Sequence, residues 1–147
     1  MEDFILLGQG GFLKLSIEEV FGFPDRTCHL GGYDTKSTIE IKSGNYYVKG
    51  EFYTSTGELF EFYEQLTDCY DRVNGSAKFL SSEQNLDLTV EFNEQGHIRV
   101  FGTFSEYAHR INELKFEFET DQTFITSTLN ELQSITRKYG GMKGIEK

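Results

Sequence analysis

The stretch from Ser55 to Val73 repeats apolar side chains with the period of an α-helix. Placed at about 100° per residue, its apolar members share an arc of roughly 120°. They are Leu59, Phe62, Tyr63, Leu66, Cys69, Tyr70 and Val73. Ser55 and Glu58 have the spacing of a capping box, in which a hydroxyl and a carboxylate each accept a backbone N–H. The pattern predicts an amphipathic helix that packs on the molecule with Leu66 near the centre of its buried face.

The opposite side of this helix is acidic. We call its five carboxylates the acidic strip: Glu58, Glu61, Glu64, Asp68 and Asp71. One guanidinium, that of Arg72, lies among them, and Phe60 lies at the edge between the polar and apolar faces. A second helical pattern covers residues 122–139, capped by Asp121 or Thr120.

Seven other runs alternate apolar and polar residues with a period of two, which is typical of strands with one wet face. They cover residues 12–21, 37–43, 46–53, 76–82, 86–93, 97–107 and 113–119. The order βββ-α-ββββ-α with short connections predicts the α+β class. We expect one domain over residues 1–147: a mostly antiparallel, curved or split sheet of about seven strands, with both helices on its apolar face. Gly50 and Gly102 are candidate bulges, and residues 139–147 are expected to form a mobile tail.

The longest loop covers residues 22–34 and contains the only proline and two adjacent glycines. Long loops in compact domains often carry function. Its candidate recognition residues are Asp25, Arg26, Tyr33 and Asp34. This loop is therefore the rival of the acidic strip as a partner-binding site.

The composition limits the partners. The 147 residues carry a net charge of −10, with 14 Phe and 8 Tyr. A negative surface repels nucleic acid and anionic membranes and favours a basic protein partner. The chain lacks an apolar run of the ~20 residues that a membrane span needs and begins with an acidic segment unlike a signal peptide. With two cysteines we expect a reducing, cytoplasmic location, and a monomer or weak homo-oligomer.

No catalytic signature is visible. Cys28 and His29 are adjacent, so their side chains point apart in an extended segment. Together with His97 and His109 they show no metal-ligand spacing. Gly8–Gly11 precedes a strand rather than a helix, so it lacks the helix N-terminus of a phosphate loop. We therefore expect no catalytic residue, no metal and no cofactor.

Several segments resemble the WapI-type immunity proteins. They are Val20-Phe-Gly-Phe-Pro-Asp-Arg-Thr-Cys-His-Leu-Gly-Gly-Tyr-Asp34, Ile41-Lys-Ser-Gly-Asn-Tyr46, Phe52-Tyr-Thr-Ser-Thr-Gly-Glu-Leu59, Phe116-Glu-Phe-Glu-Thr-Asp-Gln122 and Tyr139-Gly-Gly-Met-Lys-Gly-Ile145. The resemblance implies a protein that protects a bacterium from a contact-delivered toxin, whose toxic domain is similar to a nuclease acting on tRNA. It implies no residue roles.

The sequence thus predicts a non-enzymatic immunity protein that binds a basic toxin domain. The acidic strip with Phe60 is the first candidate surface, and the 22–34 loop is the second. Two alternatives stay open. A sheet with 14 Phe can enclose a pocket for an apolar small molecule, and free strand edges can make a self-associating scaffold.

Overall fold

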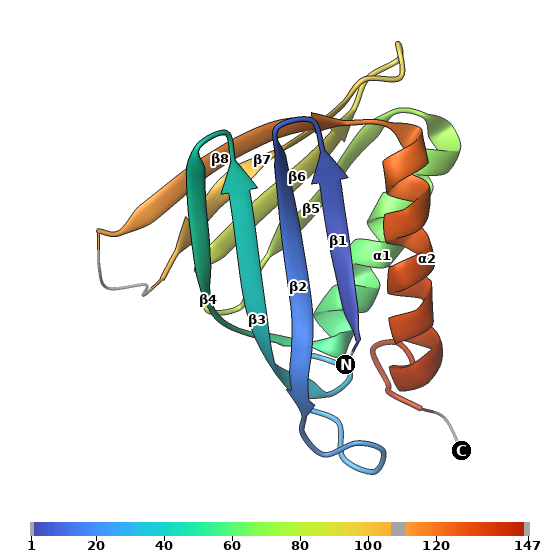
Figure 1. Ribbon diagram of the computed structural model, residues 1–147. Helices are drawn as coiled ribbons and strands as arrows, with labels where there is room; N and C mark the ends of the chain where they lie inside the picture. Colours follow the sequence, from blue (N-terminus) through green and yellow to red (C-terminus); the bar gives the residue numbers. More distant parts are fainter. Residues whose placement is uncertain (1, 107–110, 146–147) are drawn as a thin grey trace.

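The computed structural model describes residues 2–106 and 111–145 and has two antiparallel sheets and two helices (Figure 1). The first sheet has the order β1-β2-β3-β4, with strands Asp3–Gly8, Gly11–Val20, Asp34–Ser43 and Tyr46–Ser55. The second has the order β5-β6-β7-β8, with strands Gly75–Leu80, Leu86–Phe92, Ile98–Ser105 and Glu113–Thr120. Helix α1 covers Thr56–Arg72 and α2 covers Gln122–Tyr139. The α+β class is confirmed, with eight strands in two sheets rather than about seven in one.

Strand β1 was missed because its apolar run, Phe4–Leu7, lacks strict alternation. The run is apolar throughout because other elements cover both a face and an edge of β1. Phe4 and Leu6 point into the core, and the edge of the strand faces α2. There the backbone N–H of Ile5 donates to Glu131 Oε1 (3.1 Å), and Thr128 Oγ1 donates to the carbonyl of Ile5 (2.7 Å). Side chains of α2 thus satisfy an edge that would otherwise be open to pairing.

The second sheet runs diagonally behind the first, and the helices close one side of the space between them (Figure 1). Helix α2 packs on β1, α1 packs on β5, and the helices pack on each other. Strand β8 crosses the hairpin ends of the first sheet. Gln9 N–H donates to the carbonyl of Glu119 (2.8 Å), and Ser43 Oγ donates to the carbonyl of Glu117 (2.9 Å). The helices therefore line the gap between two sheets instead of covering one sheet face.

Helix α1 buries the predicted face. Leu59, Phe62, Leu66 and Cys69 are buried, and Leu66 has no exposed surface. The Phe62 ring lies 5.9 Å from that of Phe79 on β5 in an edge-to-face contact. Aromatic contacts of this kind add about 0.5–1.5 kcal/mol to the burial of apolar area. The helix thus joins the core through the residues that its periodicity indicated.

The two helix starts follow the predicted capping chemistry. Ser55 Oγ accepts the N–H of Glu58 (3.1 Å), and Asp121 Oδ1 accepts that of Phe124 (3.0 Å). At the end of α1, Val73 takes the left-handed conformation (φ 53°) and its N–H donates to the carbonyl of Cys69, while Gly75 also has a positive φ (102°). A β-branched residue rarely adopts this conformation, so tertiary packing sets the helix end here.

Neither predicted bulge is present. The pairing register runs unbroken through Gly50 and Gly102, and the irregularity lies between Ile17 and Glu19 of β2. Gly102 has another reason to be glycine: a Cβ atom there would lie 1.9 Å from the carbonyl oxygen of Asp87 on β6. The close approach of two strand backbones, rather than a kink, excludes a side chain at this position.

The segment after α2 also differs from the expected tail. Tyr139 is the last residue of α2 and is buried. Beyond it, the carbonyl of Met142 accepts the N–H of Gly32 (2.7 Å), and the N–H of Ile145 donates to the Tyr33 hydroxyl (3.0 Å). Residues 140–145 are therefore bonded to the loop between β2 and β3 instead of extending into solvent.

Candidate functional site

The acidic strip lies mostly on the outer face of α1, as predicted. Glu61, Glu64, Asp68 and Asp71 are exposed. Asp68 pairs with Arg72, whose Nε lies 3.1 Å from Asp68 Oδ2. Because a surface ion pair of this kind contributes little stability and leaves both groups in water, the strip keeps its negative character.

Glu58 has a different place. It is half-buried, its carboxylate accepts the hydroxyl of Thr54 (3.3 Å), and the backbone N–H groups of Ser55 and Ser82 also face it. Burial raises the pKa of this carboxyl above its ordinary value. Glu58 therefore joins the start of α1 to the end of β4 and to the β5–β6 turn. No local sequence pattern predicts this contact, because Ser82 lies 24 residues after Glu58 in the chain.

Phe60 is half-buried and lies against the segment that follows α2. A Cβ atom on Gly141 would be 3.2 Å from the Phe60 ring, so the glycine lets the backbone approach the aromatic face. Phe60 consequently contributes to an internal contact as well as to the surface beside the acidic strip.

Tyr33 was predicted as a recognition residue, but the structure buries it completely. Its hydroxyl donates to the carbonyl of Pro24 (2.9 Å) and accepts the N–H of Ile145 (3.0 Å). Its backbone N–H donates to Thr56 Oγ1 (2.8 Å), and the Phe23 ring meets it edge-on at 5.3 Å. Tyr33 thus holds the loop, the start of α1 and the C-terminal segment together, and it cannot contact a partner.

The other predicted loop residues, Asp25, Arg26 and Asp34, are exposed. The loop presses closely on α1: Gly32 has φ +64°, and a Cβ atom there would lie 2.2 Å from Thr56 Oγ1. Phe23 also packs edge-on against Tyr139 of α2 (5.1 Å). The loop is therefore an ordered surface built on aromatic contacts.

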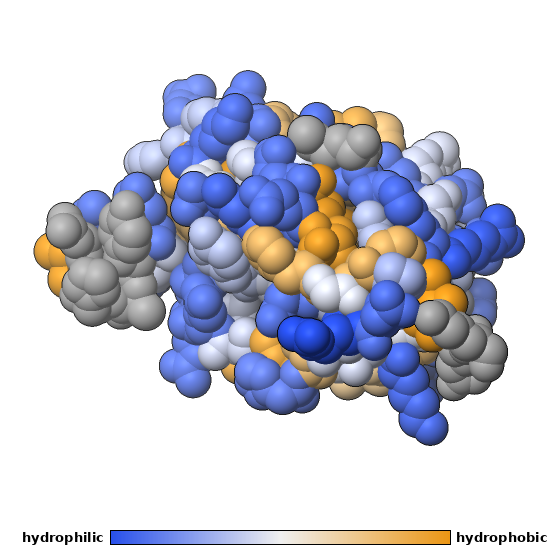
Figure 2. Space-filling view, turned by 90° about the horizontal axis from the view of Figure 1, so that it is seen from below, coloured by the Kyte–Doolittle hydropathy of each residue, from blue (hydrophilic) through white to orange (hydrophobic). Residues whose placement is uncertain are grey.

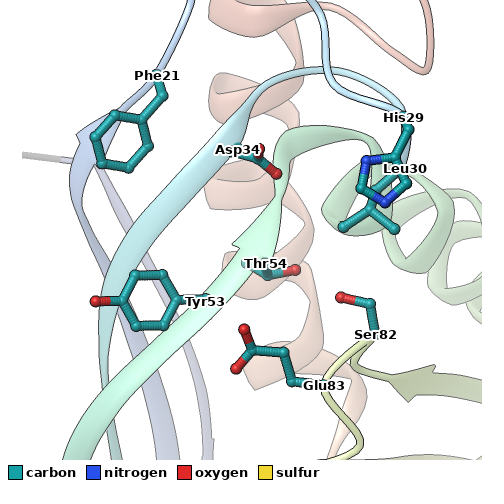
Figure 3. A pocket seen from close by; sticks show the side chains of 8 residues that line it. All are labelled: Phe21, His29, Leu30, Asp34, Tyr53, Thr54, Ser82 and Glu83. Carbon is teal, nitrogen blue, oxygen red and sulfur yellow. The ribbon is translucent and has the colours of Figure 1, made fainter.

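A pocket of about 470 Å³ opens beside this loop, where the ends of β2, β3 and β4 meet the β5–β6 turn (Figure 3). Of the predicted residues only Asp34 lines it. The full lining is Phe21, His29, Leu30, Asp34, Tyr53, Thr54, Ser82 and Glu83. Sequence reasoning missed Phe21 and Glu83 because they come from segments 62 residues apart that only the fold brings together.

The same end of the molecule exposes apolar side chains. Phe21 is 47% exposed, Phe23 38%, Met142 39% and Ile145 37%. Seen from this end, apolar residues gather in the middle of a polar surround (Figure 2). We call the exposed parts of the β2–β3 loop, the pocket and residues 142–145 the loop end. Apolar groups within a polar rim are the arrangement of many protein–protein contact surfaces.

Neither cysteine has the lowered thiol pKa of an activated nucleophile. Burial and the neighbouring Asp34 carboxylate raise the pKa of the Cys28 thiol, and burial raises that of Cys69. A nucleophilic cysteine needs the opposite shift, because the thiolate is the reactive form. Across residues 2–106 and 111–145, no group of three or more His, Cys, Asp or Glu side chains is placed to hold a metal ion. His109 lies outside the described residues.

The exposed carboxylates and aromatic side chains lie on ordered elements and form surfaces of the kind that bind other proteins. The model of the immunity protein WapI-like family matches residues 4–140. The chain therefore belongs to this family, and membership indicates that it neutralises a toxin. No curated protein sequence matches it significantly. Neither of the helices described is long and apolar enough to cross a membrane.

Proposed function

We propose that the chain binds a cognate bacterial toxin domain, of a polymorphic, contact-dependent system, and neutralises it without a reaction of its own. The observation that carries this proposal is the row of exposed carboxylates on α1, within a family of immunity proteins. Charge complementarity directs association and raises its rate, which helps when few toxin molecules must be captured early.

The toxin domain that fits this surface best is a basic one, in particular a nuclease acting on tRNA. Such an enzyme must present cationic groups to RNA phosphates. A protein with a net charge of −10 can cover those groups by matching the charge of the substrate. Because tRNA is cytoplasmic, the inhibitor would act in the cytoplasm.

The alternatives gain less support. Apolar-ligand binding needs a cavity lined by phenylalanines, but Phe4, Phe52, Phe62 and Phe79 fill the core and contact one another at 5.9–6.4 Å between ring centres. Scaffold assembly through strand edges needs open edges. The edges of β1 and β5 are occupied by α2 and α1, which leaves β4 and β8 for that function.

The test uses the toxin domain encoded in the reading frame next to this chain. Its binding to the chain is followed by surface plasmon resonance and its toxicity by growth after co-expression. Reversing Glu61, Glu64 and Asp68 to lysine should lower the association rate about tenfold at low salt, and less at high salt. The control replaces Glu91 and Glu113 of the second sheet and Glu94 of the β6–β7 turn by lysine. Equal kinetics for wild type and the helix variant at every salt concentration would exclude the acidic strip.

A second experiment addresses catalysis. Replacing Cys28 by serine and His97 and His109 by alanine, with His29 kept because it lines the pocket, should leave protection unchanged at an unchanged melting temperature. Loss of protection in a variant that still folds and still binds the toxin domain would reveal chemistry in this chain.

A further inference from the structure

The pocket at the loop end combines negative charge with aromatic surface. The carboxylates of Asp34 and Glu83 lie on either side of Thr54 (Figure 3). Both residues are exposed, so each carboxylate is accessible from outside. The rings of Phe21 and Tyr53, 47% and 41% exposed, form the wall nearest the first sheet. The pocket opening therefore combines hydrogen-bond acceptors with aromatic rings.

The walls of the pocket are held in place by internal hydrogen bonds. In the β5–β6 turn, the buried Ser81 Oγ accepts the N–H groups of Asn85 (3.2 Å) and Leu86 (3.1 Å). The neighbouring Ser82 N–H faces the Glu58 carboxylate. On the other side, the carbonyl of Asp34 accepts the N–H of Phe21 (2.8 Å). A site that is formed before binding loses less conformational entropy when a ligand enters.

The nearby cation does not occupy this site. Lys36, paired across the strands with Tyr53, forms its ion pair with Glu51 (3.8 Å). The Cys28 Sγ donates to the carbonyl of Gly31 (3.6 Å), and the neighbouring Asp34 carboxylate, together with burial, raises the pKa of this thiol. The pocket therefore offers negative charge to a cation that comes from another molecule.

An arginine side chain matches this chemistry better than other cations. Its planar guanidinium donates paired hydrogen bonds to a carboxylate and stacks on aromatic rings, whereas an ammonium group acts as a point charge. We infer that the pocket between Asp34 and Glu83 receives an arginine of the toxin domain, with the rings of Phe21 and Tyr53 as its aromatic wall. This inference rests on the proposed function and names the surface and the partner group through which it would operate.

The first experiment needs no toxin. N-acetyl-arginine amide is titrated into the ¹⁵N-labelled chain, with the uncharged analogue N-acetyl-citrulline amide as the control. Amide shifts should concentrate at Phe21, Asp34, Tyr53 and residues 82–83 and saturate with a Kd on the order of millimolar, typical of a small ligand. The citrulline compound should cause no saturable shift. Equal shifts from both compounds, or shifts spread along α1, would overturn the pocket as an arginine site.

The second experiment uses the neighbouring toxin domain and three variants with the same change in net charge. The first variant removes the pocket charges by Asp34→Asn and Glu83→Gln. The second removes two charges of the acidic strip by Glu64→Gln and Asp71→Asn. The third, with Glu94→Gln and Glu113→Gln, is remote from both surfaces. Melting temperatures check the fold. The pocket pair should weaken affinity about 30-fold or more, mainly through faster dissociation, because it leaves a bound guanidinium without its partners. The other two pairs should stay within about threefold.

The outcomes separate the two proposals. Toxin binding by wild type with equal affinity for the three variants overturns the pocket and leaves the proposed function standing. A loss equal for the pocket pair and the acidic-strip pair also overturns it, because a general charge effect then explains binding. No binding by wild type overturns the proposed function, and the inference with it. A pocket-specific loss that does not grow when one arginine of the toxin domain is also replaced, as a double-mutant cycle measures, supports it.

Discussion

The acidic strip and the loop end are two surfaces of one protein with different origins. The strip comes from one helix, and its exposed carboxylates follow directly from a 3.6-residue period. The loop end needs β2, β3, β4, the β5–β6 turn and the segment after α2 at the same place. A helix face of separate solvated charges suits attraction at a distance, whereas a preformed pocket with aromatic walls suits a bound contact. We therefore expect the strip to promote encounter with a partner and the loop end to retain it.

Both surfaces are built on α1, because the acidic strip is its outer face and Thr56 at its start accepts the N–H of Tyr33 in the loop. Leu66→Ala should lower the free energy of unfolding by about 2–5 kcal/mol, because it leaves a cavity beneath α1. Urea denaturation measures this. Glu64→Ala, on the exposed side of the same helix, should change it by less than about 0.5 kcal/mol. A loss below about 1 kcal/mol for Leu66→Ala would mean that α1 contributes less to the core than its burial indicates.

The loop end can be loosened without touching the acidic strip. Tyr33→Phe removes the hydroxyl that joins Pro24 and Ile145 and should cost about 0.5–1.5 kcal/mol, since two part-buried hydrogen bonds are lost. Amide hydrogen exchange should accelerate at residues 26–32 and 142–145 and stay unchanged in the middle of α1. Tyr46→Phe, at a tyrosine that is 71% exposed, is the control. Faster exchange along all of α1 would show that the two surfaces form one cooperative unit.

Salt should separate the contributions of the two surfaces to toxin binding. Raising NaCl from 0.02 to 0.5 M shortens the screening length from roughly 20 Å to 4 Å. The effect of the lysine reversals on the association rate should therefore fall from about tenfold to below twofold. The effect of the Asp34 and Glu83 substitutions on dissociation should persist, because it acts at contact distance. Equal salt dependence of the two effects would remove the distinction between encounter and retention.

The smallest expected effect tests whether Glu58 belongs to the strip or to the interior. Its pKa is raised by burial, so the folded state favours the protonated form, and stability falls as pH rises from roughly 4 through the raised pKa. Glu58→Gln keeps a side chain that suits the capping box and removes this loss. The variant should thus gain stability relative to wild type between pH 4 and 7, measured by urea denaturation at both values.

Glu2 supplies the control with the opposite sign. The ion pair with Lys138 lowers the pKa of Glu2. Its stabilising contribution is present above roughly pH 4 and is lost as pH falls through the lowered value. Glu2→Gln should therefore lose stability at pH 7 and approach wild type near pH 2. The same pH trend for both variants would contradict the interior role of Glu58.

The sequence by itself determined the elements whose signal is local. Periodicity and capping residues gave α1 with its buried Leu66, α2 with its Asp121 cap, and seven of the eight strands. Apolar periodicity has this power because a helix or strand must bury one side, whatever it packs against. The exposure of Glu61, Glu64, Asp68 and Asp71 follows from the same pattern.

The tertiary structure decided what depends on residues far apart in the chain. It divided the strands into two sheets, gave β1 a covering helix, buried Tyr33 under the segment after α2, and drew Glu58 inward to Ser82. It also placed Glu83 beside Asp34 and Phe21, so the pocket exists only in the fold. No local period encodes such contacts, because they arise when the free energy of packing and hydrogen bonding outweighs the entropy of bringing distant segments together.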